Sequence, residues 1–380
     1  RVSLNKNIAG VNPDSHWDQS YKMNVGIDWN VLNNRLGFTI EGYKQWDRDM
    51  LMPYRASLPS TVGNQSAYMN YGEMDSWGIE FSANWRDQIG KDFKYKIGIN
   101  TGYSDNKVLV MDWATDNTYR TVQYGDRTDI GTWGMQCLGM FRSFQEIEEY
   151  FEQQNITKYM GMTMDEVRPG MLIYKDVRSY DASTKTYGAP DGIVDNEVDQ
   201  VRLSNRSNPY GLTANLSAEW KGLSLTAQIS ASWGGYSFIP SSAIKTDAQT
   251  LEYTSMPSFW NPDNMFSYQD VYDAAGELVV AENREGKYPN LAYSNVNAVN
   301  SSFWRISGTR VRLNRLTLAY SLPKKWLTPI GISAVRVNVT GQNICDFYNP
   351  YPEKFMDPMA GGYGSYPTLR KFTIGLNVTF

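Results

Sequence analysis

The sequence predicts an all-β fold, the wall of a large transmembrane β-barrel made of about nine antiparallel strands. Apolar and polar residues alternate over segments longer than the usual globular strand of about 5 to 6 residues. The links between these segments are alternately short and long. Aromatic residues make up 14% of a chain whose mean hydropathy is −0.49, which is too polar on average to hide so many rings in one core.

The last strand shows the alternation most clearly. Its even positions are apolar, namely Phe372, Ile374, Leu376, Val378 and Phe380, and its odd positions include Lys371, Thr373 and Asn377. Because side chains alternate between the two faces of a strand, we expect the first set to face lipid and the second set to face the lumen. Earlier segments with the same pattern lie at 21–29, 36–40, 77–85, 95–103, 212–220, 223–233, 303–320 and 335–340.

Link lengths predict how the strands are connected. Short links are expected at 31–35, 87–92, 221–222 and 322–333, and long links at 52–76, 107–209, 234–302 and 344–367. This alternation describes an up-and-down meander with short periplasmic turns and long extracellular loops, the layout of outer-membrane barrels. The rings expected in an interfacial girdle beside the short turns are Trp29, Trp85, Trp220, Trp326 and Phe380.

A soluble β-sandwich is the alternative fold, since it too has alternating strands with one polar face. Sandwich strands are short and their loops are short at both ends. Several segments here reach the roughly 9 to 11 residues that cross a bilayer. Nine strands leave unpaired edges, which are costly in hydrocarbon, so we expect further strands upstream of Arg1.

Composition argues against several classes of function. The 36 Lys and Arg against 40 Asp and Glu give a net charge of −4, so no basic excess indicates binding to nucleic acid. The single histidine, His16, and the two cysteines, Cys137 and Cys345, cannot build a His/Cys zinc cluster and define no disulfide framework. We therefore expect the chain not to be an enzyme.

One segment breaks the alternation. Val311 and Leu313 occupy odd positions, whereas Leu316, Leu318 and Tyr320 occupy even positions. A β-bulge near residues 314–315 would let both sets meet lipid, because one extra residue shifts the phase of a strand. Arg312 and Arg315 would then reach the lumen. The alternative is a regular strand whose first part lies beyond the membrane.

Several short segments match known sequence patterns, and they occur in the same order as in one protein family. The segment TRVRLNRLTLAYSLP at 309–323 resembles a late-strand pattern of the form RLKNLTLGYxLP, and VRVNVTGQN at 335–343 and NPYP at 349–352 follow it. Upstream, NPD at 12–14 with Trp17, and NYGEM at 70–74 with GIE at 78–80, match NPDxxWE and NxGEM…GxE patterns. On these motifs the chain resembles SusC/RagA-type TonB-dependent outer-membrane transporters of the Bacteroidetes.

The resemblance implies a location and partners. Residues 1–380 would be the C-terminal part of a TonB-dependent receptor barrel in the cell outer membrane, with the plug domain and first barrel strands upstream. TonB would couple energy through that upstream region, and a SusD-like surface lipoprotein would cover the extracellular loops. The remaining contacts would be with the rest of its own barrel and with outer-membrane lipid.

The resemblance also implies a calcium loop. In the family a continuous DxNxDGxID segment resembles an EF-hand, where alternate carboxylates and a carbonyl bind Ca²⁺. The matching positions are Asp176, Asp191, Ile193 through its carbonyl, Asp195 and, one place late, Asp199. An insertion at 177–190 separates Asp176 from the others, so an ordinary Asp-Gly turn in a polar loop is the alternative.

Aromatic residues in the long loops are candidates for substrate binding, since flat rings with apolar faces stack on sugars. They are Trp113, Trp133, Tyr236, Trp260 and Tyr363. Packing within the loops is the alternative for each of them. The function implied is active import of a bulky nutrient, with an oligosaccharide favoured over an oligopeptide. A passive porin would share the strand pattern, and a barrel hydrolase would depend on His16.

Overall fold

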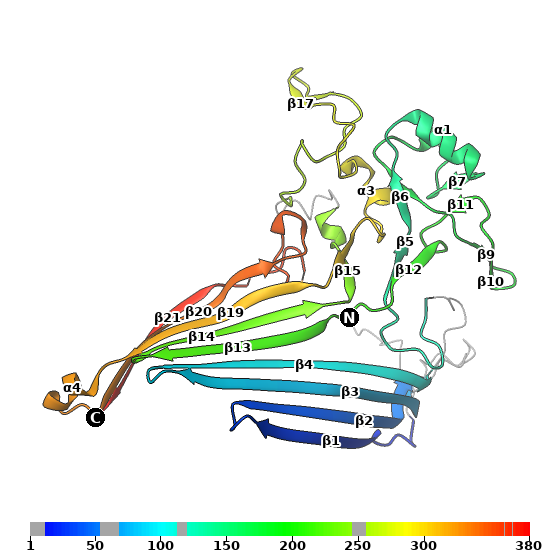
Figure 1. Cartoon of the computed structure of the whole chain (residues 1–380). Helices are drawn as coiled ribbons and strands as arrows, with labels where there is room; N and C mark the ends of the chain where they lie inside the picture. The colour runs from blue at the N-terminus through cyan, green and yellow to red at the C-terminus, as the bar shows by residue number, and fades with distance from the viewer. Residues whose placement is uncertain (1–11, 54–67, 112–119, 245–255, 361, 367) are drawn as a thin grey trace, which may run out of the picture.

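The computed structural model describes residues 12–53, 68–111, 120–244, 256–360, 362–366 and 368–380. Nine antiparallel strands form one sheet in chain order (Figure 1). They are β1 (Gln19–Val31), β2 (Leu36–Pro53), β3 (Tyr68–Ile89), β4 (Phe93–Val110), β13 (Tyr210–Trp220), β14 (Leu223–Trp233), β19 (Arg310–Ser321), β20 (Ala334–Tyr348) and β21 (Lys371–Thr379). Each strand pairs with the next one in this order, so the predicted meander is confirmed.

Shorter elements occupy the links. The loop between β4 and β13 holds β5 (Thr132–Met135), β6 (Cys137–Met140), α1 (Phe144–Gln153), β7 (Lys158–Tyr159), η2 (Met164–Glu166), β8 (Leu172–Tyr174), β9 (Ser179–Asp181), β10 (Thr186–Gly188), β11 (Ile193–Val194) and β12 (Gln200–Ser204). The loop between β14 and β19 holds β15 (Tyr236–Phe238), η3 (Ser241–Ala243), β16 (Val271–Tyr272), β17 (Leu278–Val280), η4 (Leu291–Tyr293), α3 (Ser294–Asn297) and β18 (Arg305–Ser307). Later links hold α4 (Lys324–Leu327), η5 (Thr328–Ile330) and η6 (Pro352–Lys354). None of the helices in the described ranges is long and apolar enough to cross a membrane.

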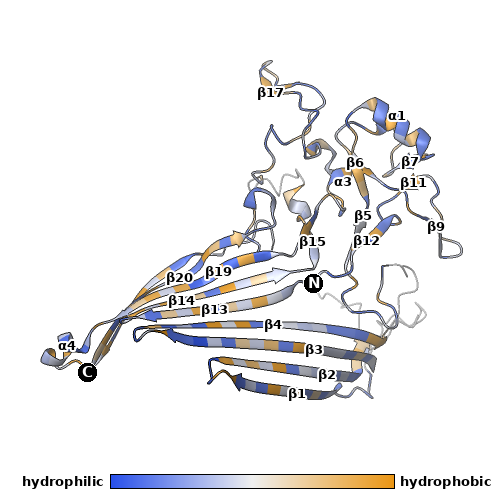
Figure 2. Cartoon of the chain, in the orientation of Figure 1, coloured by the Kyte–Doolittle hydropathy of each residue, from blue (hydrophilic) through white to orange (hydrophobic). Residues whose placement is uncertain are grey.

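Strand register puts apolar side chains of neighbouring strands on the same face. Ile27 lies opposite Ile40, and Ile40 lies opposite Phe81. In the last strand Leu376 lies opposite Val337, while Lys371 lies opposite Gln342 on the other face. Figure 2 shows the resulting alternation of hydrophobic and hydrophilic residues along the strands. The predicted separation of an apolar face from a polar face is confirmed.

The tightest turn joins β13 to β14 through two residues. Lys221 and Gly222 both have positive φ, +48° and +87°, and Trp220 pairs with Leu223 across the turn. Two positive φ values in a two-residue loop are typical of a type I′ turn, whose twist matches that of the strands. Glycine accepts this conformation without strain. The predicted short link at 221–222 is confirmed.

A β-bulge interrupts β19 at the predicted place. Gln228 of β14 pairs with Arg315 and the next residue, Ile229, pairs with Leu313, so Asn314 is the extra residue. The ladder between β19 and β20 is irregular at the same point. Beyond the bulge Leu316 pairs with Ala227, which lies on the same face of β14 as Ile229. Both apolar sets of β19 therefore share one face.

Strands at the long-loop end extend further than the alternation predicts. Residues 68–75 were expected in a loop, but they belong to β3 and pair with β2. There the outward face carries ion pairs, such as Arg48 to Asp75 at 2.8 Å and Lys44 to Asp75 at 3.9 Å. Charged residues on both faces hide the period of two, although the ladder continues.

The segment expected as one strand at 303–320 is divided. β18 (Arg305–Ser307) pairs with β15 above the sheet, and only β19 joins the main sheet. Gly308 lies between them, and its backbone N–H donates to the carbonyl of Gly235 at 3.0 Å. An added Cβ at Gly308 would approach the carbonyl oxygen of Gly234 within 2.7 Å. The chain can change sheets here because glycine permits the close approach.

The long loops pack into one unit with a hydrophobic core, which the sequence analysis did not predict. Its buried members come from the β4–β13 and β14–β19 loops, and side chains of the β20–β21 loop pack against them. Asn297 is 1% exposed, accepts the N–H of Leu172 at 2.8 Å and donates to Gly170 and Asn290. This buried amide joins the two larger loops. We call this assembly the loop unit; Figure 1 shows it at one end of the sheet.

Candidate functional site

The polar face of the sheet carries two rows of hydrogen-bonding side chains below the loop unit. In the first row Thr39, Ser82, Asn100, Thr213, Ser230 and Arg312 are successive partners on neighbouring strands. Six strands contribute one side chain each, because antiparallel register places paired residues on the same face. This row is neutral except for Arg312 at its end.

The second row has charged ends and a glycine-lined middle. Glu41 of β2 lies opposite Glu80 of β3, and Glu80 lies opposite Gly102 of β4. At the other end Ser232 of β14 lies opposite Arg310 of β19. Four strand spacings of roughly 4.8 Å separate β3 from β19, so Glu80 and Arg310 lie about 19 Å apart along the sheet, and Glu41 lies one spacing further away.

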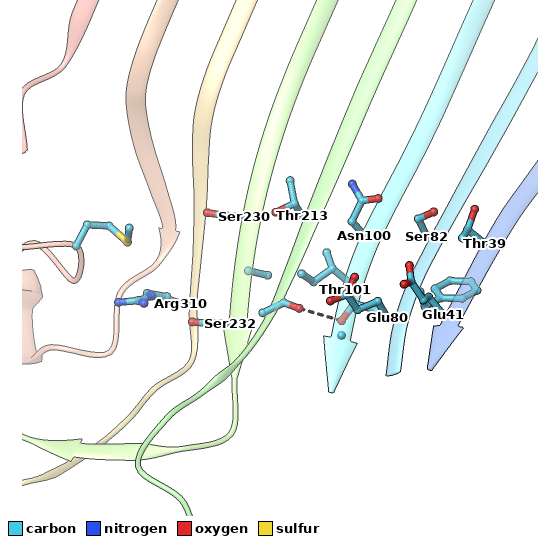
Figure 3. A pocket seen from close by; sticks show the side chains of 16 residues that line it. Thr39, Glu41, Glu80, Ser82, Asn100, Thr101, Thr213, Ser230, Ser232 and Arg310 are labelled. Atoms are coloured by element: carbon cyan, nitrogen blue, oxygen red, sulfur yellow. Dashed lines mark hydrogen bonds between the residues drawn. The ribbon is translucent and has the colours of Figure 1, made fainter. Parts of the chain in front are cut away.

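A hollow of about 540 Å³ lies over these rows. Gly102 and Gly211 line it, and at Gly211 an added Cβ would meet no atom within 4 Å. Figure 3 shows Glu41 and Glu80 at one side, Arg310 at the other and hydroxyl and amide side chains between them. The hollow exists because glycine backbone replaces side chains in the middle of the row.

The loop between β20 and β21 borders the hollow beside Arg310 and contacts that residue. Arg310 Nη1 donates to the carbonyl of Pro358 at 2.6 Å, and Met359 lines the hollow. Arg312, one step along β19, donates to Asp346 and Asp357. The position of this loop therefore depends on two guanidinium groups of the wall.

A second hollow of about 410 Å³ lies towards the short turns. Arg315, Lys96, Asn84 and Gln228 line it together with other polar residues. Arg315 is the residue that follows the bulge, so the prediction that it reaches the polar face is confirmed. The polar face thus offers donors and acceptors to a hydrophilic ligand along much of its length.

The insertion in the predicted calcium loop does not separate its ends. Residues 177–190 include the hairpin of β9 and β10, which returns the chain to its starting point. Asp176 Oδ2 accepts the N–H of Gly192 at 2.7 Å. Asp199 is fully buried and accepts the N–H groups of Val177 at 2.8 Å and Asp195 at 2.7 Å.

Two observations bear on whether this loop fits a cation. Burial raises the pKa of Asp176 and Asp199; backbone hydrogen bonds oppose this rise, and repulsion by neighbouring carboxylates adds to it. Oδ1 of Asp176 is buried without a partner. A bound cation would stabilise the ionised carboxylates and would give Oδ1 of Asp176 a partner. However, Asp191 accepts the N–H of Ile193, Asp195 accepts that of Glu197, and no metal-binding group of three acidic, His or Cys side chains occurs among the described residues. Calcium binding therefore stays a prediction.

The aromatic candidates do not form one site. Trp113 lies outside the described residues. Trp133 lies under the guanidinium of Arg202 at 5.2 Å, and Tyr236 lies under that of Arg305 at 4.6 Å. These two rings are half-buried and already have cation partners, which leaves less of each face for a sugar.

Trp260 and Tyr363 pack against the core of the loop unit. Trp260 contacts Phe259 with ring centroids 5.0 Å apart, and its Nε1 donates to the carbonyl of Ala243 at 2.8 Å. Tyr363 contacts Phe355 with centroids 5.6 Å apart. For these two residues the structure shows the packing role; a role in substrate binding stays a prediction.

Sequence reasoning missed Glu41, Glu80 and Arg310. The signal that could have found them is their parity, since each occupies a polar position between lipid-facing neighbours. Cys137 and Cys345 are both half-buried and unpaired. Burial raises the pKa of the Cys137 thiol to about 11, so it is mostly protonated at neutral pH.

The chain has relatives of known type. It is 24% identical over 393 aligned positions to TonB-dependent receptor P3 of Formosa agariphila, a match that covers 97% of this chain and 35% of the relative. TonB-dependent receptor SusC of Bacteroides thetaiotaomicron is 28% identical over 120 positions, covering 32% of this chain and 12% of SusC. The chain spans about a third of the length of receptor P3. No family model matches it.

Solved structures show the same fold. The structure of the RagAB peptide transporter superimposes with a TM-score of 0.65 at 18% identity, and the match covers 98% of this chain and 36% of that one. The open-open state of the RagAB peptide importer gives 0.63 at 18% identity, covering 98% and 36%. By its sequence relatives and its fold, the chain is similar to a barrel portion of SusC/RagA-type TonB-dependent receptors, which are outer-membrane β-barrel proteins.

Proposed function

We propose that the chain is part of the wall of an active importer that moves a bulky nutrient across the outer membrane with energy from TonB. The observation that carries this proposal is the sheet itself. One face is apolar along its strands, and the other has rows of hydroxyl, amide and charged groups below the loop unit. An amphipathic wall of this kind separates lipid from a polar path.

The polar rows support a hydrophilic substrate longer than one sugar or amino acid. About 19 Å along the sheet separates Glu80 from Arg310, Glu41 lies one strand further away, and neutral hydroxyl and amide groups lie between. Such groups bind sugar hydroxyls through hydrogen bonds, so an oligosaccharide is the first candidate. An oligopeptide is the second, because the charged ends suit an amine and a carboxylate, and the RagAB importer, whose fold the chain shares, is a peptide importer.

The proposal includes partners outside the chain. The remaining strands of the barrel would pair with the free edges of β1 and β21, since each of these has one neighbour in the sheet. A SusD-like surface lipoprotein would contact the loop unit, and TonB would act through the rest of the receptor. Lipid would cover the apolar face.

Uptake by whole cells tests active import. A strain without the receptor is complemented with the full-length gene, and growth on oligosaccharides or oligopeptides as the required nutrient is compared with and without an intact TonB. Active import predicts that growth needs both the receptor and TonB. Growth that needs the receptor but not TonB would support the passive porin and contradict the proposal.

Binding by the purified full-length receptor tests the substrate class. The double variant E41Q/E80Q removes the acidic pair, and E219Q removes a carboxylate from the same face near the short turns. An oligopeptide should bind more weakly to E41Q/E80Q, by about tenfold if one charge-assisted contact of roughly 1.5 kcal/mol is lost. A neutral oligosaccharide should lose less affinity, and E219Q should match the wild type for both.

A further inference from the structure

The link between β19 and β20 is the longest of the four short links and is folded. Residues 322–333 contain α4 and η5, whereas the other short links span 32–35, 90–92 and 221–222. Leu322 donates its N–H to Val335 at 3.0 Å, and Ser333 donates to Thr379 at 2.8 Å. The turn is therefore a fixed extension of the sheet. Figure 1 shows α4 beside the C-terminus, at the end away from the loop unit.

One apolar side chain of this turn is buried, and two apolar and two basic side chains are exposed; we call these four the exposed set. Leu327 is 3% exposed, and its carbonyl accepts the N–H of Ile332 at 3.3 Å. Trp326 and Ile330 are 57% and 66% exposed. Lys324 and Lys325 are exposed too, and neither forms an ion pair with another described residue. The fold thus displays two large apolar side chains and two ammonium groups together.

The exposed set continues the lipid-facing surface. Tyr320 of β19 lies opposite Val337, which lies opposite Leu376. The turn begins two residues after Tyr320, and Phe380 is 88% exposed at the end of the neighbouring strand. Exposed apolar residues therefore occur both on the apolar face of these strands and in the turn that follows β19.

We propose that this turn binds anionic phospholipid headgroups of the periplasmic leaflet. Short turns of outer-membrane barrels face the periplasm. Tryptophan prefers the membrane interface, and lysine stems lie along apolar surface while the ammonium groups reach phosphate. Lys324 and Lys325 would hold the phosphate, Trp326 would lie at headgroup level, and Ile330 would enter the acyl boundary. The inference does not depend on which nutrient is imported.

Lipid preference provides the first test. The full-length receptor is reconstituted in nanodiscs that mix phosphatidylglycerol with phosphatidylcholine, and the lipids retained on release are counted by native mass spectrometry. Near an anionic surface each basic side chain contributes about 1 kcal/mol, or about fivefold in affinity. The variant K324Q/K325Q should therefore lose most of the preference for phosphatidylglycerol. K175Q/K354Q makes the same charge change on the loop side and should keep the preference.

Depth of the turn provides the second test. A spin label at Ile330→Cys, in a receptor whose other cysteines are replaced, reports its accessibility to oxygen and to a water-soluble nickel chelate. The proposal predicts higher oxygen accessibility at 330 than at a label on Ser183→Cys in the exposed β9–β10 hairpin. A water-exposed label at 330, or an unchanged lipid preference in K324Q/K325Q, would overturn the proposal and indicate a turn that faces solvent or protein.

Discussion

Arg312 of β19 and Asp346 of β20 form a bidentate ion pair. Arg312 Nε lies 2.5 Å from Oδ1 of Asp346, and Nη2 lies 2.9 Å from Oδ2. Nη2 also donates to Asp357 at 2.5 Å, and Asp357 belongs to the β20–β21 loop. Arg312 is only 7% exposed. One buried guanidinium therefore ties the polar face of the wall to a long loop.

Removing Asp346 should loosen this connection. Removing the partner of a buried charge costs roughly 3 to 5 kcal/mol when the charge is left uncompensated. Asp346→Ala leaves Arg312 with Asp357 as its one carboxylate partner, so we expect a cost below that range. We expect lower stability in denaturant and faster hydrogen exchange in residues 351–360. Asp92→Ala is the control, because its pair with Lys221 at 3.6 Å is solvent-exposed and should contribute about 1 kcal/mol at most. Equal effects of the two variants would contradict the role of burial.

Deleting Asn314 tests the bulge. Without the extra residue a regular ladder would turn Val311 and Leu313 to the polar face and Arg312 to lipid. An arginine facing lipid near the bilayer midplane costs about 2 to 4 kcal/mol, in addition to the lost ion pairs. We expect little folded protein on unheated gels. Asn314→Gly keeps the residue count and should fold; a deletion variant that folds as well would refute the bulge.

The bulge was predictable because it follows from local sequence. The change of parity between Leu313 and Leu316 can be read from five apolar positions, and a strand has only two faces. The partners of Arg312 were not predictable in the same way. Asp357 reaches Arg312 only after the β20–β21 loop has folded back over the wall. Contacts within a strand leave a periodic signal, and contacts between loops do not.

The loop aromatics show the same limit. Composition marks Trp260 and Tyr363 as rings outside a strand, but it cannot distinguish a ring that stacks on a ligand from one that packs against Phe259 or Phe355. The loop unit was not predicted because its core lacks a short sequence period. Glu41, Glu80 and Arg310 could have been found by aligning the polar positions of neighbouring strands.

An arginine at Leu376 tests the orientation of the last strand. Leu376 lies opposite Val337 on the apolar face. Leu376→Arg should lower the free energy of unfolding by roughly 2 to 4 kcal/mol if the residue lies near the bilayer midplane. Thr373→Arg places the same side chain on the polar face and should cost less. Unfolding in guanidinium, measured in lipid vesicles, provides both values, and a larger cost for Thr373→Arg would reverse the assigned faces.

Asp199 should be essential to the folded loop with or without calcium. Its carboxylate accepts three backbone N–H groups, those of Val177, Arg178 and Asp195. Asp199→Asn replaces one acceptor with a donor, and an unsatisfied buried group costs about 1 to 3 kcal/mol. Proteolysis of the 177–199 segment should accelerate. Protection by added Ca²⁺ in the wild type but not in the variant would support the calcium prediction, and no effect of Ca²⁺ on the wild type would contradict it.

Asp129 should make the base of the loop unit sensitive to acid. Burial favours the neutral carboxyl, but N–H groups of Asn208, Ser207 and Gly131 and the Ser207 hydroxyl bind the ionised form and hold the pKa below 3.8. A lowered folded pKa means that this stabilisation is complete above the unfolded value and is lost as pH falls through the folded pKa. In Asp129→Asn the contact should be weak at every pH. Hydrogen exchange at Ser207 and Asn208 should therefore rise below pH 3.8 in the wild type, after correction for intrinsic rates, and stay independent of pH in the variant. A wild type whose corrected exchange is flat across that range would show that the carboxylate does not hold the two ends of the loop together.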